Sequence, residues 1–90
     1  MKMIDWNTEK NERLKKERNI SFETISEKII SKDIIDIIKH PNHAKYPNQK
    51  VFIIEVNDYI YYVPFIEDED KIFLKTIIPS RKATNKYLRK

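Results

Sequence analysis

The chain contains no glycine at any of its 90 positions. Glycine is the residue that most readily adopts the left-handed backbone conformation that tight turns and helix ends require. Asparagine, aspartate, proline and lysine must therefore form the sharp reversals of this chain. The same absence excludes glycine-rich phosphate loops, including the Walker A and dinucleotide-binding fingerprints.

The best-defined predicted element is a β-hairpin centred on Asn57 and Asp58. Two apolar segments, residues 51–56 and 59–66, flank this two-residue turn. Both turn residues tolerate the positive φ of a type I′ turn, which matches the natural twist of paired strands. The sequence therefore predicts two adjacent antiparallel strands here.

Two further strands complete the predicted sheet. Residues 71–78 follow four acidic residues, 67–70, which form a solvated turn. Residues 33–39 hold four isoleucines whose spacing suits a helix as well as a strand, and β-branching favours the strand. The 16 isoleucines of the chain favour a sheet in general. We therefore expect four antiparallel strands in a meander, with a proline-containing polar loop at 40–49.

Helices are expected before and after the sheet. Residues 7–18 are strong helix formers, and Ser21 is predicted to cap a second helix over 22–31. Ser80 is predicted to cap a short basic helix over about 81–88. The sequence thus predicts an α+β architecture, with two N-terminal helices packed on one face of a four-stranded antiparallel sheet and a short C-terminal basic helix.

Length and composition limit the class of protein. Residues 1–90 are expected to form a single domain with a thin core. The absence of cysteine excludes a disulfide scaffold and thiolate metal sites, and it fits a reducing, cytoplasmic location. No apolar run approaches the length of a membrane-spanning helix, and the first residues lack an apolar signal region, so no membrane partner is expected.

Positive charge gathers at the C-terminal end of the sequence. The net charge is +4, but residues 71–90 carry seven bases and no acid. A purely cationic segment attracts polyanions, and nucleic acid above all. A solvated basic tail would have the same composition, so charge alone leaves both interpretations open.

The two predicted turns also set a strand register. They place these residues opposite one another: Phe52 and Val63, Ile54 and Tyr61, Val56 and Tyr59, Phe65 and Ile72, Val63 and Leu74, Tyr61 and Thr76. The face that these residues share is almost entirely apolar, includes Ile78, and is expected to pack on the helices. On the other face the register places Tyr62 opposite Lys75, with Glu55 nearby.

Several polar residues are candidates for RNA chemistry. Tyr62 could stack on a base, and Lys75 could contact a phosphate or a departing oxygen. His40, with the nearby His43, is a candidate for proton transfer near neutral pH, but the two histidines lack a third ligand for a metal. Tyr–Lys cross-strand pairs and loop histidines are also common on ordinary surfaces.

Two further candidates lie at the ends of strands. Lys50 begins a strand and could point at a phosphate. Arg81, with Lys82 beside it, begins the last helix, where exposed N–H groups add to a phosphate-binding site.

Three segments resemble BrnT-type toxins of bacterial type II toxin–antitoxin systems. The first is the opening Ile4-Asp5-Trp6-Asn7 with Lys10, Asn11 and Leu14. The second is Arg-Asn-Ile-Ser-Phe-Glu at 18–23, which is similar to the family's helix-to-helix junction. The third is Ile-Ile-Pro-Ser-Arg-Lys-Ala-Thr at 77–84, followed by Tyr87. Residues 34–49 match the family poorly.

The resemblance implies a RelE-like fold and a metal-independent ribonuclease that inhibits translation. It also implies a cognate antitoxin, encoded by an adjacent gene, that covers the site. Arg81 matches the family's arginine after the last strand, and Lys50 stands near its basic residue that opens the second strand.

We therefore expect attack of the RNA 2′-OH on the adjacent phosphate, without metal or cofactor. The expected catalytic residues are Arg81, Lys75, Lys50, Tyr62 and His40, and the expected RNA-binding residues are Lys82, Lys86 and Arg89. The partners would be RNA, with ribosome-associated mRNA as one form of it, and the antitoxin. The alternatives are a non-catalytic RNA- or DNA-binding module and a protein-interaction module of the same fold.

Overall fold

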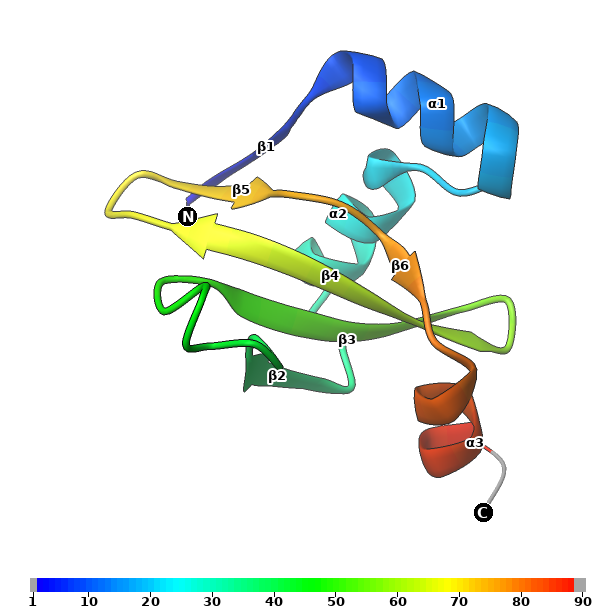
Figure 1. Cartoon of the computed structure of the whole chain (residues 1–90). Coiled ribbons are helices and arrows are strands. Elements are labelled where there is room, and N and C mark those ends of the chain that lie inside the picture. Colours follow the sequence, from blue (N-terminus) through cyan, green and yellow to red (C-terminus); the bar gives the residue numbers. More distant parts are fainter. Residues whose placement is uncertain (1, 89–90) are drawn as a thin grey trace.

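The structure is a computed structural model that describes residues 2–88. In chain order its elements are β1 (Met3–Trp6), α1 (Thr8–Arg18), α2 (Phe22–Ile30), β2 (Asp36–Lys39), β3 (Lys50–Val56), β4 (Tyr59–Glu67), β5 (Lys71–Leu74), β6 (Ile78–Pro79) and α3 (Arg81–Leu88). Figure 1 shows helices packed around one curved sheet. The predicted α+β class is confirmed, and the sheet differs from the prediction in size and in strand direction.

The sheet is mixed and has six strands. Its order is β1-β5-β4-β3-β2, and β6 pairs with β4. The prediction of four antiparallel strands missed β1, which runs parallel to β5 and pairs Trp6 with Leu74. A four-residue strand has too little alternation to be recognised locally, and its partner lies far along the chain. Strand β2 is also shorter than the predicted strand over 33–39.

The central hairpin has the predicted register. Phe52 lies opposite Val63, and the turn residues Asn57 and Asp58 have φ values of 53° and 62°. The other positive φ values in the described chain belong to Asn19, which caps α1, and to Lys32. A chain without glycine thus makes its left-handed turns with asparagine, aspartate and lysine.

The acidic segment after β4 is a turn, as predicted, and Asp68 organises it. One carboxylate oxygen of Asp68 accepts hydrogen bonds from the backbone N–H groups of Asp70, at 2.8 Å, and of Lys71, at 2.9 Å. These bonds stabilise the charged carboxylate and hold the pKa of Asp68 below its ordinary value, the Lys71 amide having the larger effect. Asp68 therefore closes the turn that a glycine would often form.

A bulge interrupts the strand that was predicted over 71–78. Leu74 lies opposite Phe65, and Ile78 lies opposite Tyr62. Between these two pairs β4 has two residues and the facing segment has three, so one extra residue is inserted. Pro64 lies at this point, and its carbonyl accepts a 2.8 Å hydrogen bond from the Lys75 N–H. Proline has no N–H to return to that neighbour, so the regular ladder stops there.

The acidic turn and the bulge together overturn three parts of the predicted register. Phe65 faces Leu74 rather than Ile72, because the acidic turn is centred one residue later than expected. Ile77 is fully buried in the core, whereas Ile78, which was expected to be buried, is 42% exposed. Tyr62 lies opposite Ile78, so the predicted pair between Tyr62 and Lys75 does not form. The inserted residue reverses the inside and outside positions that follow it.

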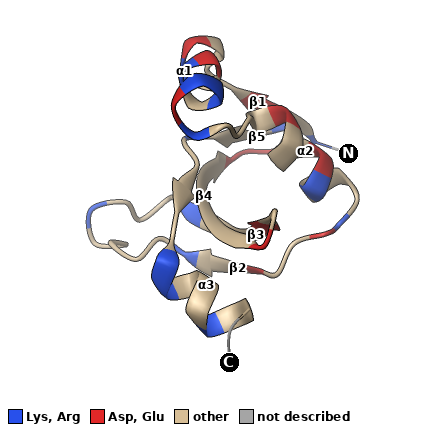
Figure 2. Ribbon diagram, turned by 90° about the vertical axis from the view of Figure 1, so that its right-hand side faces the viewer, with Lys and Arg blue, Asp and Glu red and all other residues tan. Residues whose placement is uncertain are grey.

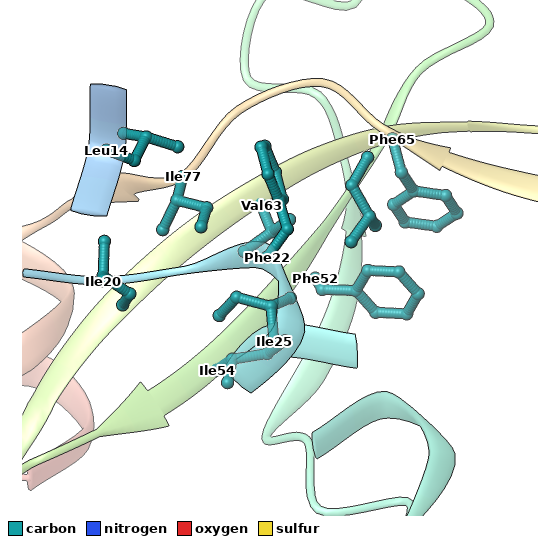
Figure 3. Packing of buried hydrophobic residues seen from close by; sticks show 10 residues of the cluster. Leu14, Ile20, Phe22, Ile25, Phe52, Ile54, Val63, Phe65 and Ile77 are labelled. Carbon is teal, nitrogen blue, oxygen red and sulfur yellow. The ribbon is translucent and has the colours of Figure 1, made fainter. Parts of the chain in front are cut away.

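The sheet carries a separate apolar cluster on each face. The larger one unites α1 and α2 with β3, β4 and β5, and Figure 3 shows its side chains: Leu14, Ile20, Phe22, Ile25, Phe52, Ile54, Val63, Phe65 and Ile77. The smaller one joins Ile53 and Ile60 to Ala83 of α3. The expectation that the helices share one face is therefore wrong, because α3 covers the outer face of the sheet (Figures 1 and 2). Trp6 is half-buried and stacks on Phe22, with ring centroids 5.8 Å apart.

One buried amide holds the junction between α1 and α2. The side-chain oxygen of Asn11 accepts a 2.8 Å hydrogen bond from the Phe22 N–H, and its nitrogen donates to the Glu23 carboxylate at 2.7 Å. The Asn11 bond is the main reason why the pKa of Glu23 lies below its ordinary value. Ser21 caps α2, as predicted, by accepting a bond from the Thr24 N–H.

The variant Asn11→Ala is expected to lower the free energy of unfolding by about 1–3 kcal/mol, because the Phe22 N–H would be left buried without a partner. Urea denaturation followed by circular dichroism measures the change. Asn85→Ala is the control, since Asn85 is exposed on α3, and it should have almost no effect. Equal stability of the two variants would contradict the role of Asn11.

The same junction is expected to weaken in acid. The pKa of Glu23 is lower in the folded chain than in the unfolded chain. Its contribution to the free energy of unfolding is therefore present when the pH is above the ordinary pKa of a carboxyl group, and it is lost as the pH falls through the folded pKa. Asn11→Ala should reduce that acid-dependent loss.

A buried threonine attaches α3 to the sheet. The Thr84 hydroxyl accepts a 2.9 Å hydrogen bond from the Ile60 N–H and donates at 2.8 Å to the Ser80 carbonyl. Ser80 also caps α3, as predicted, through a 3.1 Å bond from the Ala83 N–H to its hydroxyl. The Thr84 hydroxyl thus accepts the Ile60 N–H of β4, as the carbonyl of a neighbouring strand would.

The variant Thr84→Val keeps the shape of the side chain but removes both bonds, and it is expected to cost about 1–3 kcal/mol because the Ile60 N–H would be left unpaired. Thermal unfolding gives the change in stability. If amide exchange in the variant becomes faster in α3 than in β3, the loss of stability lies at the attachment of α3. A melting curve identical to that of the wild type would disprove the attachment.

Candidate nucleic-acid interface

Most of the positive charge in the described chain has no acidic partner. The ion pairs found in residues 2–88 involve only three cations, which are Lys2, Lys15 and Lys28. Figure 2 shows Lys and Arg at both ends of α3 and no acidic residue on that helix. Three groups of free cations lie on different elements, and the predicted site residues within 2–88 are divided among them.

The first group lies on α3. Arg81, Lys82 and Lys86 are exposed, and Lys86 lies over the Tyr87 ring at 5.4 Å. Tyr62 faces this helix but is half-buried in the outer cluster beside Ala83 and Tyr87. Its ring therefore helps to attach α3, a packing role that the sequence did not suggest. Arg89, which was predicted to bind RNA, lies outside the described residues.

The second group lies beside α1, at the end of β5. Lys75 follows β5 at the bulge and lies over the Phe73 ring, with its ammonium 5.7 Å from the centroid. Its neighbours in space are Lys10 and Arg13 of α1, which line the same hollow. Lys75 is thus separated from Tyr62, with which it was expected to act.

The third group surrounds an open pocket of about 390 Å³ at the start of β3, which we call the lysine-pair pocket. Its lining residues are Lys39, His43, Pro47, Asn48, Gln49 and Lys50. Lys39 and Lys50 lie directly opposite each other on β2 and β3. Like charges in that position destabilise a sheet, and no carboxylate lines the pocket. A bound anion would relieve this repulsion.

The loop at 40–49 has a defined conformation that shapes this pocket. The Tyr46 N–H donates a 3.0 Å hydrogen bond to the Asn42 carbonyl, and the His40 N–H donates to the Gln49 carbonyl at 3.2 Å. The two ends of the loop are therefore joined, and His43 is held over the strand ends that carry the lysine pair.

His40 makes contacts that favour a structural role. Its Nδ1 accepts a 3.0 Å hydrogen bond from the Asn42 N–H, and its ring packs on Tyr46 with centroids 4.7 Å apart. Both contacts engage the His40 ring within the loop. His43 is exposed, and no hydrogen bond from the described chain occupies its ring. Of the two histidines, His43 is therefore the freer group for proton transfer.

The sequence prediction named Lys50 but did not place Lys39 opposite it. The signal that could have revealed Lys39 was the register of the strand over 33–39, which was ambiguous in the sequence. His43 was recognised as a loop histidine but was not chosen over His40, because the turn that engages His40 is not visible in the residue pattern.

Two features are absent from residues 2–88. No group of three His, Cys, Asp or Glu side chains converges in a way that would hold a metal ion. None of the helices there is long and apolar enough to cross a lipid bilayer.

No protein-family model, curated protein or solved structure matches the chain.

The variant Lys39→Glu is expected to raise the free energy of unfolding by up to about 1 kcal/mol at low salt, because it turns a like-charge cross-strand pair into an attractive one. Chemical denaturation at low and high salt measures the effect, which screening should reduce. The double variant Lys39→Glu/Lys50→Glu restores a like-charge pair and should lose the gain. A stability gain that survives in the double variant would show that the lysines do not repel each other.

Proposed function

We propose that this chain is a ribonuclease toxin that resembles the BrnT type and that the lysine-pair pocket is its cleaving centre. The observation that carries the proposal is the placement of Lys39, Lys50 and His43 around one pocket without a carboxylate. This pocket joins two phosphate-binding cations to a side chain that can transfer protons. RNA cleavage without a metal requires both.

The reaction begins with the 2′-hydroxyl of RNA beside the scissile phosphate. The 2′-oxygen attacks phosphorus and forms a new P–O bond, while the bond from phosphorus to the 5′-oxygen of the next nucleotide breaks. The His43 imidazole accepts the proton of the 2′-hydroxyl, and the leaving 5′-oxygen takes up a proton from solvent or from the imidazolium. The products are a 2′,3′-cyclic phosphate and a free 5′-hydroxyl.

The two lysines stabilise the charge that develops during this reaction. The attacked phosphate gains negative charge as it becomes five-coordinate, and ammonium groups fixed beside it favour that state over the ground state. No carboxylate lines the pocket to neutralise these ammonium groups before that charge appears. Asn48 and Gln49 in the lining supply additional hydrogen-bond donors.

The residues that carry the family resemblance have a different task in this fold. Trp6 and Asn11 both contact Phe22 at the junction of α1 and α2. Arg18 donates a 3.0 Å hydrogen bond to the Ile77 carbonyl at the bulge. The resemblance therefore supports a shared architecture, and the argument for cleavage rests on the pocket.

The cations of α3 are assigned to RNA binding. Arg81, Lys82 and Lys86 are exposed, unpaired within the described chain, and accompanied by no acidic residue on their helix. They lie on the outer face, away from the lysine-pair pocket. Arg81, expected from the sequence to be the foremost catalytic residue, would then contact the RNA backbone, and a cognate antitoxin from the adjacent gene would act by covering these cations.

Cleavage of a labelled single-stranded RNA tests the proposal. His43→Ala and Lys50→Ala are each expected to lower the cleavage rate by about 100-fold or more, because each removes a group that acts in the transition state. Arg81→Ala should mainly weaken binding. The wild-type reaction should continue in EDTA and leave a 2′,3′-cyclic phosphate.

Lys16→Ala is the matched control, since Lys16 is exposed on α1 and lies outside the pocket. A 2′-O-methylated RNA, which lacks the attacking hydroxyl, should bind but remain intact. Wild-type protein that binds RNA without cutting it would favour the non-catalytic module. If His43→Ala and Lys50→Ala both cleave RNA at the wild-type rate and Arg81→Ala does not cleave it, the cleaving centre lies at α3. Growth arrest on expression, relieved by the adjacent reading frame, tests the toxin role.

A further inference from the structure

A second cationic hollow, of about 470 Å³, lies between α1 and β5. We call it the α1–β5 hollow, and its lining residues are Asn7, Glu9, Lys10, Arg13, Phe73 and Lys75. None of them belongs to the lysine-pair pocket or to α3. Only Lys75 among them was expected to act on RNA, and its expected partner was Tyr62.

The parallel pairing of β1 with β5 creates this hollow. Asp5 lies opposite Phe73 and Trp6 opposite Leu74, and α1 begins directly after this pair. The first turns of α1 are therefore held beside the point where β5 meets the bulge. Arg18, at the other end of α1, fixes the bulge through its bond to the Ile77 carbonyl. Both walls of the hollow are thus anchored at each end.

The charge of the hollow is strongly unbalanced. It gathers three cations, Lys10, Arg13 and Lys75, against the single carboxylate of Glu9. No ion pair within residues 2–88 involves any of these cations. Lys75 is directed by the Phe73 ring, whose face lies 5.7 Å from its ammonium. Lys10 and Arg13 are three residues apart and therefore project from the same side of α1.

We propose that the α1–β5 hollow binds the phosphate backbone of single-stranded RNA as a second contact, outside the cleaving centre. This inference rests on the proposed function only for the choice of RNA as the polyanion. An arginine fork and two ammonium groups match the geometry and charge of a phosphate better than those of a single carboxylate.

The position of the hollow fits such a second contact. Lys50 lies opposite Phe65, and Lys75 lies opposite Pro64 on the other side of β4. Two strand spacings, about 10 Å, therefore separate the two backbones. Lys50 shares a face with Phe65, whereas Lys75 follows the core residue Leu74 and points to the other face, so an RNA strand that contacts both must be longer than this backbone separation. The hollow would hold RNA in position while the lysine-pair pocket acts on it.

Binding of a fluorescent 2′-O-methylated RNA oligonucleotide tests the hollow independently of cleavage. The triple variant Lys10→Ala/Arg13→Ala/Lys75→Ala is expected to bind more weakly, and the slope of log affinity against log salt should fall by about 2, since each phosphate contact contributes about 0.7 for single strands. Alanine preserves helix α1, and thermal unfolding verifies that the fold is kept. Lys16→Ala removes one charge from the same helix outside the hollow and should leave affinity and slope nearly unchanged.

The outcomes separate this inference from the proposed function. Weaker binding with a reduced slope in the triple variant, and near-normal cleavage of a dinucleotide by the same protein, support a second RNA contact. Wild-type affinity and slope in the triple variant overturn it, even if Lys50→Ala still abolishes cleavage. The inference is also overturned if the triple variant loses no more affinity per removed charge than Lys16→Ala does. General electrostatic attraction would then explain the binding. Failure of wild-type protein to bind any RNA would overturn both proposals and leave an acidic protein surface as the partner of these cations.

Discussion

Pro64 sets the arrangement of the second half of this protein. A proline in a central strand cannot donate a hydrogen bond to its neighbour, and here its free side faces the segment after β5. The ladder breaks there, one extra residue enters the facing segment, and Arg18 satisfies the Ile77 carbonyl. The inserted residue turns Ile77 into the core and Ile78 outward. It therefore decides where α3 starts and which face of the sheet α3 covers.

The positions of the cations are not explained by the packing of the fold. Two lysines lie opposite each other on β2 and β3, and three cations converge between α1 and β5. Neither arrangement adds stability, since like charges repel and a carboxylate nearby would be favourable. Repulsion of this kind is relieved by a polyanion, and two such places on one small domain favour a long anionic chain over a single small ligand. The buried polar residues Asn11 and Thr84, in contrast, have all their hydrogen bonds within the fold.

Much of the local structure could be predicted from the residues themselves. The hairpin turn at Asn57 and Asp58 follows from turn chemistry, and the serine caps at Ser21 and Ser80 follow from the demand of helix ends for an acceptor. The candidate site was predicted less well. Lys50 lies in a cationic pocket as a phosphate contact would, but Lys39, its cross-strand partner, depends on the register of a strand that the sequence left ambiguous. The expected pair of Tyr62 and Lys75 was lost to the shifted acidic turn and to one inserted residue.

The sequence by itself determined what short-range physics decides: the helices, the caps, the left-handed turns without glycine, the hairpin register and the surplus of positive charge. Each of these depends on neighbours a few positions away. Only the tertiary structure decided that β1 pairs with β5, that α3 covers the outer face, and that cations from separate elements share a hollow. Those outcomes depend on contacts between distant residues and on a single missing N–H at Pro64. Strand register has a period of two, so one additional residue exchanges the buried and exposed positions beyond it.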